Sequence, residues 1–189
     1  MNTNRKVMNT EIEKAAGSCV LYETENDLPR NTRGKVIGII NQRLADIIDL
    51  QNQLKHAHWN VKGPHFIGLH ELFDKIAEEV GSYVDIIAER IVQLGGLAEG
   101  TVRVAASRSR LAEYPLDIAD GLVHVEAVAR ALSIFGREAR MSIKETEGLG
   151  DADTVDILTE VSRGIDKWLW FVEAHTQASK SSSQPAYRS

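Results

Sequence analysis

The sequence predicts an all-α protein, on three observations. Four long segments carry apolar residues at the 3.6-residue spacing of an amphipathic helix. No segment keeps up the apolar and polar alternation of a half-buried strand. The chain has 189 residues, of which 43% are hydrophobic and 26% charged, which is the size and composition of one globular domain. A single helical bundle with tails follows from these features.

The first two helices are predicted on either side of a Gly-Pro turn. One runs from about 32 to 60 and ends before Gly63-Pro64, because proline cannot continue a helix. The next begins at Phe66 and ends before Gly95-Gly96, and at about 1.5 Å per residue it is about 43 Å long. Their apolar residues recur at helical spacing: Ile40, Leu44, Ile47, Leu50, Leu54, Leu69, Leu72, Phe73, Ile76, Val80, Val84, Ile87, Ile91 and Leu94.

Two more helices are predicted in the second half of the chain. The third starts with Asp117 as its N-cap and runs toward Glu147, and the fourth follows the link 148–151. The links within each pair are short, so each pair forms an antiparallel hairpin. The link 95–116 is long enough to cross the full length of a helix, which allows the second and third helices to run parallel. This is the ferritin-like four-helix arrangement. We divide the chain into an N-terminal tail 1–30, a bundle 31–176 and a disordered C-terminal tail 177–189.

Charge and composition exclude several classes of protein. The net charge is −5, and residues 36–175 hold 14 Lys/Arg against 22 Asp/Glu, so the bundle attracts cations and repels phosphate. Any DNA contact must therefore use the weakly basic tails. No apolar run approaches the roughly 20 residues of a membrane helix, no signal-peptide stretch is present, and Cys19 has no disulfide partner. We expect no membrane association and a cytoplasmic location.

A stripe of metal-binding residue types marks the second helix. His70, Asp74, Asp85 and Glu89 follow a spacing of 4, 11 and 4, which places them within about 100° of one another around the helix. The spacing is palindromic, since His70 and Glu89 share their midpoint at 79.5 with Asp74 and Asp85. The ends of the stripe are about 28 Å apart, so one chain cannot close a metal site.

An antiparallel homodimer would solve this geometry. A two-fold axis would bring His70 and Asp74 of one chain to Asp85 and Glu89 of the other, and the small residues Ala77 and Gly81 would let the helices approach. His58, in the last turn of the first helix, completes the set. Two imidazoles and three carboxylates suit Fe(II), with Zn(II), Co(II) and Mn(II) as competitors.

The residues around this stripe resemble a known family. Residues 58–74 read HWNVKGPHFIGLHELFD and residues 85–96 read DIIAERIVQLGG, and both are similar to the Dps family, the DNA-binding proteins from starved cells. Three later segments agree: 114–117, 153–159 and 166–171. The resemblance covers roughly residues 20–175.

The resemblance implies a hollow dodecamer that binds Fe(II) between subunits, oxidises it preferentially with hydrogen peroxide, stores ferric mineral and protects DNA. His58, His70 and Asp74 match the ligands from one subunit, and Asp85 and Glu89 those from its partner. Trp59 matches an aromatic beside the iron site, although a packing role explains it equally well. Asp151, Asp153 and Asp156 match acids that line a three-fold pore, although helix capping is an equal alternative.

Two rival functions remain to be weighed. A di-iron site inside each bundle would need Glu-x-x-His motifs, and the sequence has none. A nucleoid-compacting protein with secondary iron chemistry would need strongly basic tails, whereas the N-terminal segment offers Arg5, Lys6 and Lys14 interrupted by Glu11 and Glu13. The C-terminal tail adds only Lys180 and Arg188. The sequence leaves open whether DNA is bound through these tails.

Overall fold

The computed structural model describes residues 21–181 and confirms the all-α prediction. Its helices are α2 (Arg30–Asn60), α3 (Phe66–Gln93), α4 (Val102–Arg108), α5 (Gly121–Gly148) and α6 (Ala152–Ser181), and the described residues contain no strand. The last helix continues past the boundary expected at 176. Cys19 and the basic residues of the N-terminal tail lie outside the described residues, as does Arg188.

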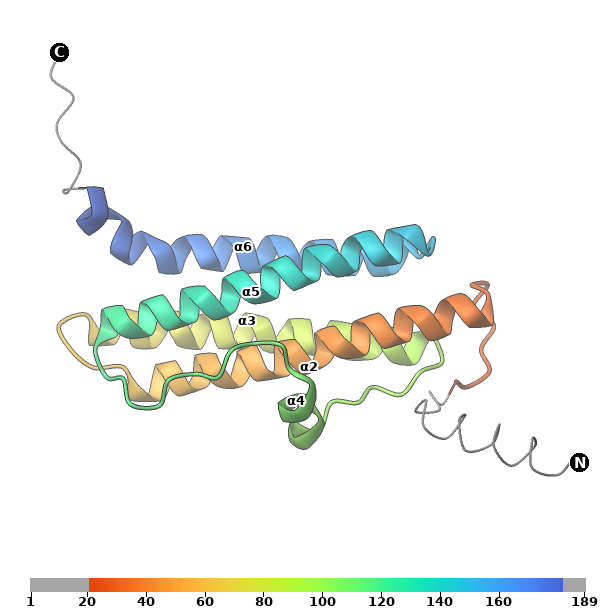
Figure 1. Cartoon of the computed structure of the whole chain (residues 1–189), viewed down its shortest axis with the longest axis horizontal. Coiled ribbons are helices and arrows are strands. Elements are labelled where there is room, and N and C mark those ends of the chain that lie inside the picture. Colours follow the sequence, from red (N-terminus) through yellow and green to blue (C-terminus); the bar gives the residue numbers. More distant parts are fainter. Residues whose placement is uncertain (1–20, 182–189) are drawn as a thin grey trace, which may run out of the picture.

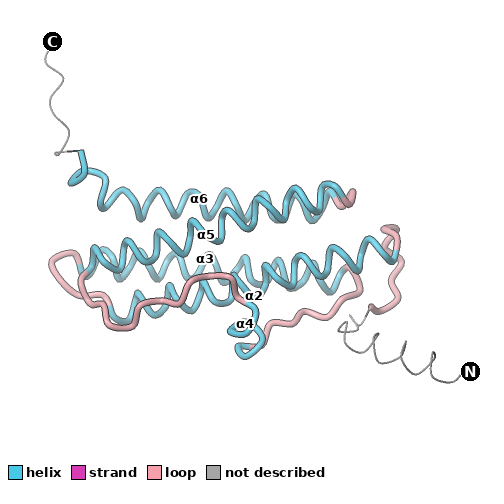
Figure 2. The backbone as a smooth tube through the Cα atoms, viewed as in Figure 1, coloured by secondary structure: helices cyan, strands magenta, loops and turns pink. Residues whose placement is uncertain are grey.

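The four long helices form two antiparallel hairpins that lie side by side (Figure 1). One hairpin is α2 with α3, the other is α5 with α6, and α2 also packs against α5. The crossover between α3 and α5 runs back along the bundle, so these two helices point in the same direction (Figure 2). The parallel arrangement expected from the length of the crossover is therefore confirmed.

The core fills the space between the hairpins with large apolar side chains. Leu44, Phe73, Phe135 and Ile165 are almost completely buried, and each comes from a different long helix. Fully burying a side chain of this size stabilises the fold by about 1.5–3 kcal/mol. The four helices therefore depend on one another, and the bundle is a rigid support for the residues on its surface.

Two sequence predictions about the crossover and α5 are wrong. Asp120, not Asp117, is the N-cap of α5, and its carboxylate accepts hydrogen bonds from the backbone N–H groups of Leu122 and Val123. The crossover contains the short helix α4, whose N-cap Thr101 accepts a hydrogen bond from the backbone N–H of Val104. Seven residues are too few to show a helical period, which explains the omission.

The turn between α2 and α3 is fastened to the start of α5. The backbone N–H of Lys62 donates to the carbonyl oxygen of Ala119 at 2.9 Å. Gly63 turns the chain with a φ of 108°, a conformation that glycine adopts without strain. This contact fixes the last turn of α2 against the first turns of α3. Within the described residues, no helix is long and apolar enough to cross a membrane.

Candidate metal centre

The structure brings His58 of α2 and His70 of α3 together. Their rings stack with centroids 3.8 Å apart and planes inclined by 22°. The Nδ1 atom of each imidazole lies 2.8 Å from the backbone carbonyl oxygen of the other residue. A carbonyl only accepts, so both rings carry their proton on Nδ1. Both Nε2 lone pairs are therefore left for a metal ion, and the carbonyls orient the rings as outer-shell partners do in metal sites.

Asp74 lies one turn beyond His70 and faces the same depression. Its Oδ1 is 3.9 Å from Nδ1 of His58 and 2.5 Å from the Lys55 ammonium nitrogen. The hydrogen bond from Lys55 holds the pKa of the Asp74 carboxyl below its usual range. The carboxylate is thus charged and already paired with a cation. A divalent ion bound here must take over the place of the ammonium group.

Asp85 and Glu89 lie farther along α3 and point to solvent. They are 11 and 15 residues beyond Asp74, or about 16 and 22 Å along the helix. Neither makes a hydrogen bond or ion pair with any residue that the structure describes. Among the described residues of one chain, no group of three or more His, Cys, Asp or Glu side chains is placed to hold a metal ion. One chain therefore holds the predicted ligands in two separate groups, His58, His70 and Asp74 in one and Asp85 and Glu89 in the other.

The small residues Ala77 and Gly81 of α3 contact α2 of their own subunit. Ala77 is 2% exposed, and its carbonyl oxygen accepts a hydrogen bond from the Gln51 side-chain amide of α2. A Cβ atom on Gly81 would lie 2.6 Å from the same amide nitrogen. Both residues face α2 within the subunit. Ala77 is therefore covered within its own subunit, whereas Gly81 is half-buried, and the expectation that small residues let two copies approach stays a prediction.

Trp59 stands beside the histidines and is 68% exposed. The Lys55 ammonium nitrogen lies 5.8 Å from the centroid of its ring. Because the ring is so exposed, it does not pack in the core of its own subunit, which was the alternative role that the sequence left open. An aromatic role beside a metal ion stays a prediction.

The three acids at the start of α6 differ from one another. Asp151 is 2% exposed, pairs with the Arg90 guanidinium at 2.8 Å and accepts a hydrogen bond from the Thr154 backbone N–H at 3.0 Å. It caps α6 and joins it to α3, so its side chain is occupied within the subunit. Asp153 is 81% exposed at its side chain, and Asp156 is also exposed. Asp153 also lies 3.7 Å from the Arg90 guanidinium. Pore lining stays a prediction, and Asp153 and Asp156 are the two acids exposed enough to serve it.

The remaining histidines lie in other surroundings. His56 packs its ring edge-on against Tyr114, whose hydroxyl is 2.7 Å from Nδ1 of the fully buried His124. Burial lowers the pKa of His124. His65 precedes α3, and His175 lies near the backbone carbonyl of Phe171. The sequence analysis missed the Tyr114–His124 pair and Lys55. Lys55 could have been found, because three residues before His58 on a helix is a position on nearly the same face.

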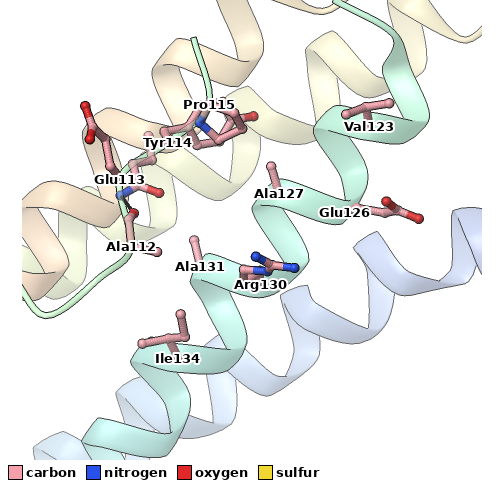
Figure 3. Close-up of a pocket in the computed structure, with 11 residues that line it drawn as sticks. Ala112, Glu113, Tyr114, Pro115, Val123, Glu126, Ala127, Arg130, Ala131 and Ile134 are labelled. Carbon is pink, nitrogen blue, oxygen red and sulfur yellow. Dashed lines mark hydrogen bonds between the residues drawn. The ribbon is translucent and has the colours of Figure 1, made fainter. Parts of the chain in front are cut away.

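A separate cavity of about 210 Å³ lies between the crossover and α5 (Figure 3). Tyr114 and Pro115 form one wall, and Ala127, Arg130 and Ala131 form the other. No histidine lines it, and its acids Glu113 and Glu126 come from opposite walls. The cavity is distinct from the depression of about 440 Å³ that holds His58, His70 and Asp74.

Comparisons with known proteins agree with this architecture. Residues 37–181 match the family model described as a ferritin-like domain. The chain is 44% identical over 156 residues to a DNA protection during starvation protein of Agrobacterium fabrum, covering 82% of this chain and 96% of the relative. The solved structure of DpsA14 from Streptomyces coelicolor is similar with a TM-score of 0.79 and 34% identity, over 83% of this chain and 93% of that one. A tetragonal form of Mycobacterium smegmatis Dps gives a TM-score of 0.77 and 33% identity, over 81% and 92%.

Proposed function

The chain belongs to the Dps family of ferritin-like proteins, and from this premise we propose that it is a ferroxidase that oxidises Fe(II), preferentially with hydrogen peroxide. The family's general role is iron storage and DNA protection. The observation that carries the proposal is the pair of histidines, since each ring is held by the other residue's carbonyl with its Nε2 atom free. Such prearranged imidazoles beside a carboxylate suit a divalent transition metal.

The proposed site is shared between two subunits. His58, His70 and Asp74 bind Fe(II) from one side, and Asp85 and Glu89 of the partner subunit complete the ligand set from the other. Two stacked imidazoles supply one ligand for each of two neighbouring ions or both ligands for a single ion. Asp74 is already ionised, so iron needs to displace only the Lys55 ammonium group. Trp59 lies where it can intercept stray oxidising equivalents.

The reaction balances without other reductants. Two Fe(II) ions each lose one electron, and one hydrogen peroxide molecule takes up both electrons and two protons to give two water molecules. No hydroxyl radical is released, because both electrons are taken from ions held at the protein. The ferric product is then stored inside a cage of twelve subunits. We propose that iron enters through a three-fold pore lined by the exposed acids Asp153 and Asp156, whereas Asp151 is used within the subunit to cap α6.

Anaerobic stopped-flow measurements test the proposed oxidant. Protein loaded with Fe(II) should consume about one peroxide molecule per two iron ions, faster than an air-saturated sample oxidises the same load. Zn(II) should inhibit, because it takes the same ligands and has no redox chemistry. An Asp85→Asn/Glu89→Gln variant is the matched control for iron oxidised outside the site. Equal or faster oxidation by dissolved oxygen would contradict the peroxide preference.

DNA contact through the tails is a separate proposal. The basic tail residues lie outside the part of the chain whose side chains the structure describes, so the charge count and avidity across many subunits are its support. A cage lacking residues 1–14 and 177–189 should keep its ferroxidase activity and lose DNA affinity in a salt-series gel shift. Full DNA affinity in that cage would place binding on the bundle. A cytoplasmic, nucleoid-associated location goes with this proposal.

A further inference from the structure

Two surface depressions lie at opposite ends of α3 and differ in chemistry. The first, of about 440 Å³, contains His58, His70 and Asp74, and Ile67 stands at its edge with 63% of its surface exposed. The second, of about 540 Å³, is lined mainly by apolar groups of Ala88, Val92 and Ala98 next to Glu89. Val92 is 59% exposed. Each end of the helix thus presents metal ligands together with an uncovered aliphatic side chain.

The positions of the aliphatic residues follow the palindrome of the ligands. Ile67 and Val92 share the midpoint of 79.5 with His70 and Glu89. At about 100° per residue, both lie within about 10° of the centre of the ligand stripe. A two-fold axis that brings His70 and Asp74 to Asp85 and Glu89 of the partner subunit must therefore also bring Ile67 to Val92 of the partner subunit.

We propose that Ile67 packs into the apolar depression around Val92 of the partner subunit, forming an apolar plug at each end of the two-fold interface. This inference rests on the proposed function, because it uses the shared metal site, and it names the contact that holds that site together. The occupant is a second copy of this chain. The register of the palindrome supports that choice, and the depression offers the aliphatic surface that an isoleucine side chain requires.

The charges of the interface explain why such a plug is needed. Glu71, Asp74 and Glu78 lie around the first depression, and Asp85 and Glu89 lie farther along the same helix. Lys75 and the Lys55 that pairs with Asp74 offset part of this charge, but five carboxylates against two cations still make two facing copies repel one another before metal ions bind. An apolar contact is not weakened by this repulsion, so it keeps the two halves of the site together while the site is empty. It also excludes water beside the ligands, which strengthens electrostatic interactions there.

Cysteine cross-linking tests the contact directly. In full-length protein with Cys19→Ser, the pair Ile67→Cys and Val92→Cys should give covalent dimers on a non-reducing gel after treatment with diamide. The two positions are about 37 Å apart on one straight helix, so no disulfide can form within a chain. The matched control pairs Ile67→Cys with Met141→Cys, an exposed position on α5 that lines neither depression. Absence of cross-linking, or equal cross-linking in the control, would overturn the proposal.

A second measurement guards against a cysteine variant that misfolds. Ile67→Ser should raise the protein concentration at which the assembly dissociates by at least about tenfold, because an exposed isoleucine is no longer buried at the interface. Met141→Ser is the control, since Met141 is exposed on α5 and lines neither depression. An unchanged dissociation concentration for Ile67→Ser would contradict the plug.

The experiments distinguish a failure of the Ile67 contact from a failure of the ferroxidase proposal. If cross-linking fails while mixed assemblies of ligand variants recover ferroxidase activity, the shared site stands and the plug is wrong. If cross-linking succeeds while peroxide fails to oxidise Fe(II), the interface stands and the ferroxidase proposal is wrong. Failure of both would reject the two-fold arrangement.

Discussion

Two groups of charged residues in this bundle are arranged in opposite ways. Between α2, the crossover and α5, Arg43 pairs with Asp46 at 2.8 Å and with Glu138 at 3.3 Å, and Arg110 pairs with Glu138 at 3.2 Å. On α3, Asp85 and Glu89 have no partner among the described residues. The first group is complete within one chain. The second group has no partner within the described chain, which leaves its carboxylates available to solvent, to a metal ion or to a second subunit.

The difference separates charges that hold the fold from charges that we propose bind a metal ion. Burial raises the pKa of Asp46 despite the nearby Arg43, and the Arg110 backbone N–H donates to its carboxylate at 2.8 Å. Partial burial would also raise the pKa of Glu138, but hydrogen bonds and charge from Arg110 and Arg43 outweigh it and lower that pKa. This group fixes the crossover to the bundle. Asp85 and Glu89 of α3 make no such contacts with the described residues of the chain.

The largest expected effect comes from breaking the complete group. Arg43→Met should lower the free energy of unfolding by about 3–5 kcal/mol, because it leaves Asp46 buried without its ion partner. Urea denaturation measures this change. Arg103→Met, on the surface of α4, is the control and should change stability by less than about 0.5 kcal/mol. Similar values for the two variants would mean that the Arg43 group does not hold the crossover.

The incomplete group should respond in the opposite way. Glu89→Gln should weaken Zn(II) or Fe(II) binding at least about tenfold, or about 1.4 kcal/mol, while the unfolding free energy stays unchanged, because Glu89 has no partner within the described chain. Calorimetric titration and urea denaturation measure the two quantities. Glu145→Gln on α5 is the matched control. A large loss of stability in Glu89→Gln would show that the residue belongs to the fold.

A third test measures how the stability of the protein depends on pH through His124, a buried residue that belongs to neither charged group. The pKa of His124 is lowered by burial, so the unfolded chain binds this proton at a higher pH than the folded one. Its contribution to stability is therefore complete above the ordinary histidine pKa of about 6.5 and is lost as pH falls below it, by up to about 1.4 kcal/mol per pH unit. His124→Gln should reduce this slope in urea denaturation between pH 7 and about 5. If the slope of the unfolding free energy against pH is unchanged in His124→Gln, a group other than His124 causes the pH dependence.

The smallest expected effect concerns the cation already at the site. Lys55→Met removes the ammonium group from Asp74, and Zn(II) should bind about 2–5-fold more tightly, in line with the energy of a half-exposed ion pair. The pKa of Asp74 should rise toward its usual range in the metal-free protein. Lys75→Met, which removes a charge from the same depression, is the control. Weaker binding in Lys55→Met would show that the ammonium supports the site.

The sequence predicted the long helices well because their signal is local. Periodicity set α3 within one residue of its bounds, while the seven-residue α4 is too short to show a helical period. Asp117 and Asp120 both have the side chain of an N-cap, so residue type did not distinguish between them. The ligand types and spacing also came from sequence. Three features could not be predicted from the sequence, because they depend on packing between helices. They are the reciprocal hydrogen bonds of His58 and His70, the ion pair of Asp74 with Lys55 and the burial of Asp151.

The central claim is that each metal site is shared between two chains, and mixed assemblies test it most directly. A His70→Ala/Asp74→Ala chain and an Asp85→Ala/Glu89→Ala chain should each lack ferroxidase activity. In a verified heterodimer, one of the two sites receives all four ligands, so co-expressed assemblies should recover activity that both parents lack. Persistent inactivity in verified heterodimers would contradict the shared site.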